Sequence, residues 1–191
     1  GKNITFNLEL DDTGSIGVGY EGTALLHISG GTLVRSGVGY LGYKAGSNGT
    51  AFVVGEGSEW NNSGSLSVGT NGEGTLNIMA GAVVNVAGTT TLNNSTLHIE
   101  LLGTTSGPSL FTDELELGGT LEISLADGFV PELGNSFDIL DFNTVSGSFA
   151  EMNLPALEDS LLWDTSELLA RGAICVGSCP AGIGGDFNYD G

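Results

Sequence analysis

Positive charge is what this sequence has least of. Its 191 residues include 4 Lys and Arg against 23 Asp and Glu, which gives a formal net charge of −19. A surface that binds nucleic acid or an anionic membrane needs clustered Lys and Arg, so both partners are excluded. Long apolar runs are missing as well. None approaches the roughly 18 to 20 residues that cross a bilayer, so we expect no membrane insertion.

Cysteine is almost as scarce, and both copies lie near the C-terminal end. Cys175 and Cys179 are too few for a disulfide scaffold, and their spacing favours one short loop-closing disulfide in an oxidising compartment. The alternative is a free and inert pair of thiols. Metal binding by these two cysteines would need further ligands close by, which the sequence does not supply.

Glycine, in contrast, is abundant, with 33 copies, yet a strict Gly-X-Y period is missing and collagen is excluded. Residues 1–99 carry 20 of the glycines and a net charge of −4, whereas residues 100–191 carry a net charge of −15. This shift divides the chain. We expect glycine-rich repeats over 1–100, an acidic β-rich continuation and cap over 101–176, and a linker with a short tail over 177–191.

The first half contains an internal repeat. Aligning Val18-Gly19 with Val68-Gly69 makes the chain match itself at a constant offset. Between these two phrases the pattern occurs once more, because Gly-Thr pairs begin at positions 22, 49 and 74. A period of this length is typical of a solenoid, in which one coil buries its apolar face only against the next coil.

Each repeat unit consists of short segments with apolar residues at alternate positions. Leu26 and Ile28 are predicted to point inward and His27 outward, and the same pattern recurs at 76–78. Gly, Asn and Ser separate the segments and supply the positive-φ corners of a coil. We therefore predict an all-β fold, a right-handed parallel β-helix (β-solenoid) with a C-terminal β-rich cap. Its first strands are expected at 24–29, 32–35, 51–54, 75–78 and 82–86.

The second half continues the strand pattern with acidic outward positions. Glu114, Glu116 and Glu122 are predicted to form a solvated face, and Phe137 and Ile139 to point inward. The stretch 154–170 is ambiguous, because its leucines at 157, 161, 168 and 169 would also line a helix. We favour a turn, a strand at 161–164, a short helical turn and then a strand at 173–176. Because the end of a solenoid exposes unpaired backbone, this half is predicted to cap it.

Several phrases of the chain match those of a known repeat. They are Gly-x-Gly-Thr-Leu-x-Ile at 72–78, Gly-Ser-x-Trp at 57–60, Leu-Ser-Val-Gly at 66–69 and Trp-Asp-Thr-Ser at 163–166. Over residues 15–176 the chain resembles the PEP-CTERM/autotransporter-associated β-repeat of exported bacterial proteins. The resemblance implies secretion, surface display and a parallel β-helix, and it brings no catalytic residues with it.

Asp186, Asn188 and Asp190, followed by Gly191, match the opening half of a calcium-binding loop. Oxygen ligands at positions 1, 3 and 5 surround a hard cation, and the glycine permits the sharp turn. The closing carboxylate would come beyond the glycine, so the loop is incomplete in this sequence and weak calcium binding is expected. This segment resembles the start of a dockerin-type repeat, with 177–185 as the linker before it.

Motifs for catalysis are weak. Residues 17–22 and 37–42 both match the dinucleotide-binding pattern G-x-G-x-x-G, but neither precedes a helix-like segment whose N-terminus would receive the pyrophosphate. His27 and His98 are each predicted to lie alone on outward strand positions. No nucleophile elbow is present, and the two cations of the repeat region adjoin no acidic cluster. We therefore predict that the chain is not an enzyme.

Aromatic residues leave one question open. Tyr20, Tyr40, Tyr43 and Trp60 would stack on sugar rings if exposed, and would pack at corners or in the core if buried. The sequence predicts a non-catalytic extracellular or cell-surface β-solenoid with a structural or adhesive role. One alternative is a module that binds or cleaves polysaccharides, with surface glycans as partners. Another is a self-associating filament subunit that pairs through a strand at residues 4–10.

Overall fold

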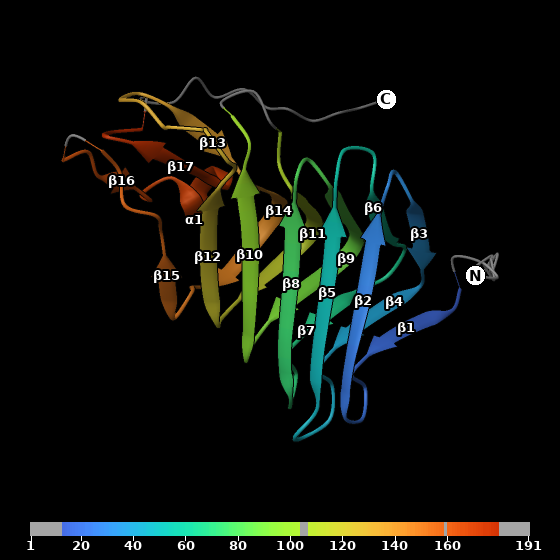
Figure 1. Ribbon diagram of the computed structural model, residues 1–191. Coiled ribbons are helices and arrows are strands. Elements are labelled where there is room, and N and C mark those ends of the chain that lie inside the picture. Colours follow the sequence, from blue (N-terminus) through green and yellow to red (C-terminus); the bar gives the residue numbers. More distant parts are fainter. Residues whose placement is uncertain (1–12, 104–106, 159, 180–191) are drawn as a thin grey trace.

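Two parallel sheets face each other across the core (Figure 1). The computed structural model describes residues 13–103, 107–158 and 160–179. Within these residues the first sheet has the strand order β15-β12-β10-β8-β5-β2. Its strands are β2 (Thr23–Ser29), β5 (Asn48–Val54), β8 (Glu73–Met79), β10 (Ser95–Leu101), β12 (Thr120–Leu125) and β15 (Glu151–Asn153).

The second sheet runs behind the first and follows the order β1-β4-β7-β9-β11-β14. Strand β3 pairs with β6, and β6 pairs in turn with β9, so part of this sheet is wider. The strands are β1 (Ser15–Val18), β3 (Leu33–Ser36), β4 (Val38–Leu41), β6 (Glu59–Asn62), β7 (Leu66–Val68), β9 (Val83–Leu92), β11 (Leu110–Leu117) and β14 (Leu140–Gly147).

The register between strands gives the length of one coil. Ile28 is aligned with Val53, and Val53 with Ile78. One coil therefore extends from Ile28 to Val53, and the next from Val53 to Ile78. The offset between Val18-Gly19 and Val68-Gly69 in the sequence therefore spans two coils. All pairings within the two long sheets are parallel, which confirms the predicted β-solenoid.

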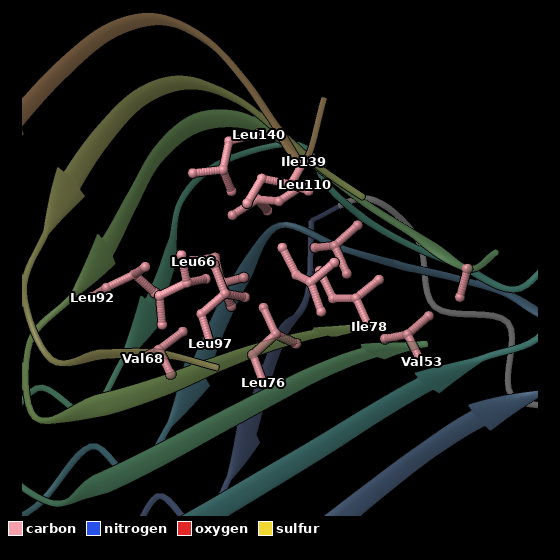
Figure 2. Close-up of a cluster of buried hydrophobic side chains, with 14 of the residues drawn as sticks. Val53, Leu66, Val68, Leu76, Ile78, Leu92, Leu97, Leu110, Ile139 and Leu140 are labelled. Atoms are coloured by element: carbon pink, nitrogen blue, oxygen red, sulfur yellow. The ribbon is translucent and has the colours of Figure 1, made fainter. Parts of the chain in front are cut away.

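Apolar side chains form columns inside the coils. Leu76, Leu97 and Leu121 are aligned across β8, β10 and β12, and each is fully buried. A parallel column of Val53, Ile78 and other β-branched residues lies two positions along (Figure 2). Because side chains alternate between the faces of a strand, this period-2 pattern places one apolar set inward in every coil. Burial of these columns is the main favourable contribution to folding.

Glycine allows neighbouring coils to touch at one corner. Gly19, Gly42 and Gly69 follow β1, β4 and β7, and their φ angles are +60°, +63° and +72°. A Cβ atom on any of them would overlap a backbone carbonyl group of a neighbouring turn. The oxygen in question belongs to residue 48, 73 or 94, respectively. Glycine is therefore needed twice here, for the left-handed backbone and for the close approach.

Trp60 belongs to the core, which answers part of the question about the aromatic residues. Its side chain is fully buried on β6, and its indole Nε1 donates a hydrogen bond of 3.1 Å to Ser36 Oγ on β3. Ser36 Oγ in turn donates to Asn62 Oδ1 at 2.7 Å. This buried polar chain joins two successive coils, and it leaves Trp60 with no surface for a sugar ring.

The C-terminal part forms the predicted cap. An antiparallel sheet of order β13-β17-β16 contains β13 (Ser136–Asp138), β16 (Trp163–Asp164) and β17 (Ala173–Val176). The short helix α1 (Leu168–Arg171) precedes β17, as predicted, and packs against the last coil at β14. Leu140 N donates to the carbonyl oxygen of Gly172, which links the cap to β14.

One strand near the C-terminal end is shorter than the sequence predicts. The strand expected at 161–164 is reduced to Trp163–Asp164, and Leu162 is 75% exposed. The reason is that β16 pairs with β17 over only two residues. The strand expected at 4–10 lies outside the described residues.

Candidate functional site

A cluster of three tyrosines occupies the glycine corner of the first two coils. Tyr20 follows Gly19, and Tyr43 follows Gly42, so the two tyrosines hold the same position in successive coils. Their rings are stacked, with centroids 4.7 Å apart and an interplanar angle of 9°. The distance matches the spacing of roughly 4.8 Å between neighbouring strands. In the third coil the equivalent residue is Thr70, so the aromatic stack ends there.

Tyr40 supports this stack from the side. It lies on β4, and its ring meets Tyr43 at 4.8 Å and Tyr20 at 5.9 Å, in both cases edge to face. The residue aligned with Tyr40 on β1 is Gly17, and a Cβ there would lie 3.1 Å from the Cβ of Tyr20. Edge-to-face contacts of this kind are favourable beyond the area that they bury. Tyr40 and Tyr43 are half-buried, whereas Tyr20 is 41% exposed.

One ion pair borders the tyrosines. Lys44 Nζ contacts Glu21 Oε1, and the same nitrogen lies 5.5 Å from the centroid of the Tyr20 ring. The hydrogen bond to Lys44, followed by its charge, lowers the pKa of Glu21, and Glu21 raises the pKa of Lys44 for the same reasons. Both groups therefore stay charged at neutral pH. We call Tyr20, Tyr40, Tyr43, Lys44 and Glu21 the tyrosine cluster.

The tyrosine cluster combines a partly exposed aromatic ring with an ion pair whose ammonium group lies over that ring. The ring offers a flat apolar surface, while the ammonium and the carboxylate offer a donor and an acceptor. Sequence reasoning identified the tyrosines but not that they meet, nor that Lys44 and Glu21 lie beside them. The signal that would have placed them together is the recurrence of Val18-Gly19-Tyr20 as Leu41-Gly42-Tyr43, about one coil later in the sequence.

His98 is not alone on the outer face of the first sheet, which corrects the sequence prediction. Its Nδ1 lies 3.1 Å from Asn77 Oδ1, and its Nε2 lies 2.8 Å from Ser124 Oγ. Asn77 also donates to the carbonyl oxygen of Ala51 at 3.1 Å. The solenoid brings together side chains that are far apart in the sequence, and here they form a polar chain across successive coils.

A cavity of about 450 Å³ lies near the junction of the solenoid and the cap. Its walls include Phe111 and Phe137, and the carboxylate-bearing residues Glu56, Glu100 and Asp138 also line it. Burial, together with the nearby Asp141 carboxylate, raises the pKa of Asp138 to about 6, and Arg171 partly opposes this rise. Glu100 Oε2 is engaged as an acceptor for the backbone N–H of Ala80 at 2.9 Å.

The structure joins Cys175 and Cys179 in a disulfide, with Cα atoms 5.2 Å apart. Asp164 stabilises this turn, because its Oδ2 accepts from Cys179 N at 3.0 Å and its Oδ1 from Ser166 N at 2.9 Å. These hydrogen bonds, with Cys179 the larger contributor, lower the pKa of the Asp164 carboxyl. The calcium-loop residues Asp186, Asn188 and Asp190 lie outside the described residues.

Comparisons of this chain with protein-family models, with curated proteins and with solved structures found no match. In the described part of the chain, no group of three or more His, Cys, Asp and Glu side chains is arranged to hold a metal ion. None of the helices there is long and apolar enough to cross a membrane.

Proposed function

We propose that this chain is a non-catalytic structural and adhesive module of an extracellular or cell-surface β-solenoid. The observation that carries the proposal is the continuous parallel ladder from β2 through β5, β8, β10 and β12 to β15. Each coil in such a ladder is held by the backbone hydrogen bonds of its neighbours, which makes the stack a stiff spacer. A stiff spacer holds a binding surface away from the body to which it is attached.

The exterior of the solenoid supports this role. Glu114 and Glu116 on β11 are exposed, and each accepts a hydrogen bond from a threonine of the preceding coil, Thr89 at 3.0 Å and Thr91 at 2.9 Å. A net charge of −19 keeps such a surface hydrated and opposes non-specific association. The Cys175–Cys179 disulfide is of the kind that persists in an oxidising, extracellular environment.

The direct test is whether the chain adheres to polysaccharides without cleaving them. Beads coated with the full chain are passed over surfaces that carry neutral or acidic polysaccharides, and released sugars are measured in the same experiment. We expect retained beads and no product. Beads coated with a Gly42→Ala variant, in which the coil corner is disturbed, serve as the control and should be retained less. Time-dependent release of reducing ends or of unsaturated uronates would overturn the proposal.

A second candidate function is self-association through sheet edges. Within the described residues the first sheet ends at β2 and at β15, and an uncovered edge strand offers unpaired backbone groups to another chain. Light scattering against protein concentration, with and without calcium, tests this function. A mass that grows with concentration supports a filament subunit, and a constant monomer mass counts against it.

A further inference from the structure

We infer that Ser124 is a modification site, at which an uncharged activated ester transfers its acyl group to the serine hydroxyl. His98 is the base of this reaction, and Asn77 is the positioning residue that orients His98. Ser124 Oγ lies 2.8 Å from His98 Nε2, and His98 Nδ1 lies 3.1 Å from Asn77 Oδ1. A hydroxyl within hydrogen-bond reach of a base that a third group orients is the arrangement that activates a serine nucleophile. The inference goes beyond the structural and adhesive role, because it adds a covalent reaction to the outer face of the solenoid.

The hydrogen bonds decide which nitrogen of His98 carries the proton. Asn77 Nδ2 donates to the carbonyl oxygen of Ala51 at 3.1 Å, so Asn77 presents Oδ1, an acceptor, to His98. An acceptor opposite Nδ1 requires an N–H there, which leaves a free lone pair on Nε2 of the neutral imidazole. Ser124 Oγ therefore donates to His98 Nε2. This is the direction in which a base removes the proton of a serine.

The three side chains come from successive coils and share the outer face of the first sheet. Asn77 on β8 is aligned with His98 on β10, and Ser124 on β12 lies two residues beyond Glu122, the residue aligned with His98. Strands β5 and β15 flank these three strands, so the group lies inside the ladder and not at its end. Asn77 is 7% exposed, whereas His98 and Ser124 are half-buried. Burial fixes the positioning residue, while the base and the nucleophile stay accessible to a reagent.

The reaction exchanges one ester bond for another. Ser124 Oγ attacks the carbonyl carbon of the ester, an Oγ–C bond forms, and His98 Nε2 takes up the serine proton. The bond from the carbonyl carbon to the leaving oxygen then breaks, and the proton passes from Nε2 to that oxygen. The products are an acylated Ser124 and a free alcohol or phenol, so no further reactant is required.

Two features restrict the reaction to activated and uncharged esters. His98 Nδ1 faces an amide rather than a carboxylate, so the imidazolium is stabilised less than in a Ser-His-Asp triad, and only a good leaving group departs. The alkyl ester formed on Ser124 lacks such a leaving group and therefore persists, in keeping with a non-catalytic chain. The net charge of −19 repels an anionic acyl group.

Labelling of the full chain with p-nitrophenyl butyrate tests the site. Mass spectrometry follows the butyryl group, and peptide mapping locates it, so that acylation of amines is counted apart. We expect Ser124 to be the labelled serine and Ser124→Ala to carry no serine label. The His98→Gln variant should label about a hundredfold or more slowly, because it lacks the base. Asn77→Ala should slow labelling less than His98→Gln, at an unchanged urea midpoint.

Ser29 is the matched internal control. It is exposed at the end of β2 on the same face of the sheet, outside the hydrogen-bond chain of His98. We expect no label on Ser29 in the parent chain and an unchanged rate at Ser124 in Ser29→Ala. Because the two serines are compared within one folded chain, this comparison does not depend on whether a variant folds.

Three outcomes would overturn the site: no label on Ser124, equal labelling of Ser29, or an unchanged rate in His98→Gln. Release of p-nitrophenol beyond one equivalent per chain, lost in Ser124→Ala, would show that the acyl group does not persist. That result would also overturn the non-catalytic function. A failure to adhere to polysaccharides, in contrast, overturns the adhesive role and leaves acylation of Ser124 in place.

Discussion

Substitution of Gly42 by alanine should loosen the stacking of the coils. Gly42 has a φ of +63°, and a Cβ atom at this position would overlap the carbonyl oxygen of Glu73 in the next turn. Gly46, in the same loop, offers a matched control. Its φ is +75°, but a Cβ there would meet nothing within 4 Å. The pair therefore separates the cost of a left-handed backbone from the cost of pushing two coils apart.

The magnitudes follow from these two terms. A left-handed backbone costs a non-glycine residue about 1 kcal/mol, and this term applies to both variants. Only Gly42→Ala must also separate its turn from the next one. That separation stretches the hydrogen bonds from Gly72 N to Gly42 O at 3.0 Å and from Gly69 N to Leu41 O at 2.8 Å. At about 1 kcal/mol for each bond, we expect a loss of about 3 kcal/mol for Gly42→Ala and about 1 kcal/mol for Gly46→Ala.

Equilibrium unfolding in urea measures the difference. Far-ultraviolet circular dichroism follows all coils, and tryptophan fluorescence follows the surroundings of Trp60 in the core and of Trp163 in the cap. Repeat structures can unfold coil by coil, so free energies are compared only where the two transitions coincide. If Gly42→Ala proves no more destabilising than Gly46→Ala, within about 0.5 kcal/mol, then coil contact is not what requires glycine at this corner.

Three further predictions concern the core, the cavity and the cap. Trp60→Ala should cost about 3 to 5 kcal/mol and Trp60→Phe, which loses the hydrogen bond to Ser36, only about 1 to 2 kcal/mol; equal losses in urea unfolding would contradict this assignment. Because the pKa of Asp138 is raised to about 6, the folded state holds this proton more tightly than the unfolded state, and stability falls as pH rises from about 4 to 6. Asp138→Asn should therefore raise stability by about 1 kcal/mol at pH 8, a value reduced for solvent screening, and give no gain near pH 3. If thermal melting shows the same change in stability for Asp138→Asn at both pH values, the raised pKa of Asp138 is not the cause. Replacement of Cys175 and Cys179 by serine should lower stability by about 2 kcal/mol and remove the response to reductant, and a variant that still responds would contradict the disulfide assignment.

Much of the fold follows from local sequence features. Alternation of apolar residues in Leu26 and Ile28 or in Leu76 and Ile78 selects strands, and the regular recurrence of this pattern selects a solenoid. The strand Ala173–Val176 and the helical turn before it match the prediction as well. These features are short in range, because side-chain direction in a strand depends only on the parity of the position.

The candidate site depends on contacts that are long in range. Tyr20 and Tyr43 are distant from each other in the sequence, and only the length of one coil decides that their rings stack. The length of one coil also brings His98 into hydrogen-bonding contact with Asn77 and Ser124, although nothing in the sequence links these three polar residues. A difference of one residue in a corner would shift such a pair out of register and turn one side chain to the opposite face.

The sequence by itself therefore determined the type of element, the coil repeat and the acidic exterior, because composition and periodicity act within a few residues. The tertiary structure decided that Trp60 is buried while Tyr20 is exposed, although both are aromatic residues of the same repeat region. It also decided that Lys44 meets Glu21 beside the stacked rings. The physical reason is the register between coils, which is fixed by backbone hydrogen bonds and by close approach at the corner glycines.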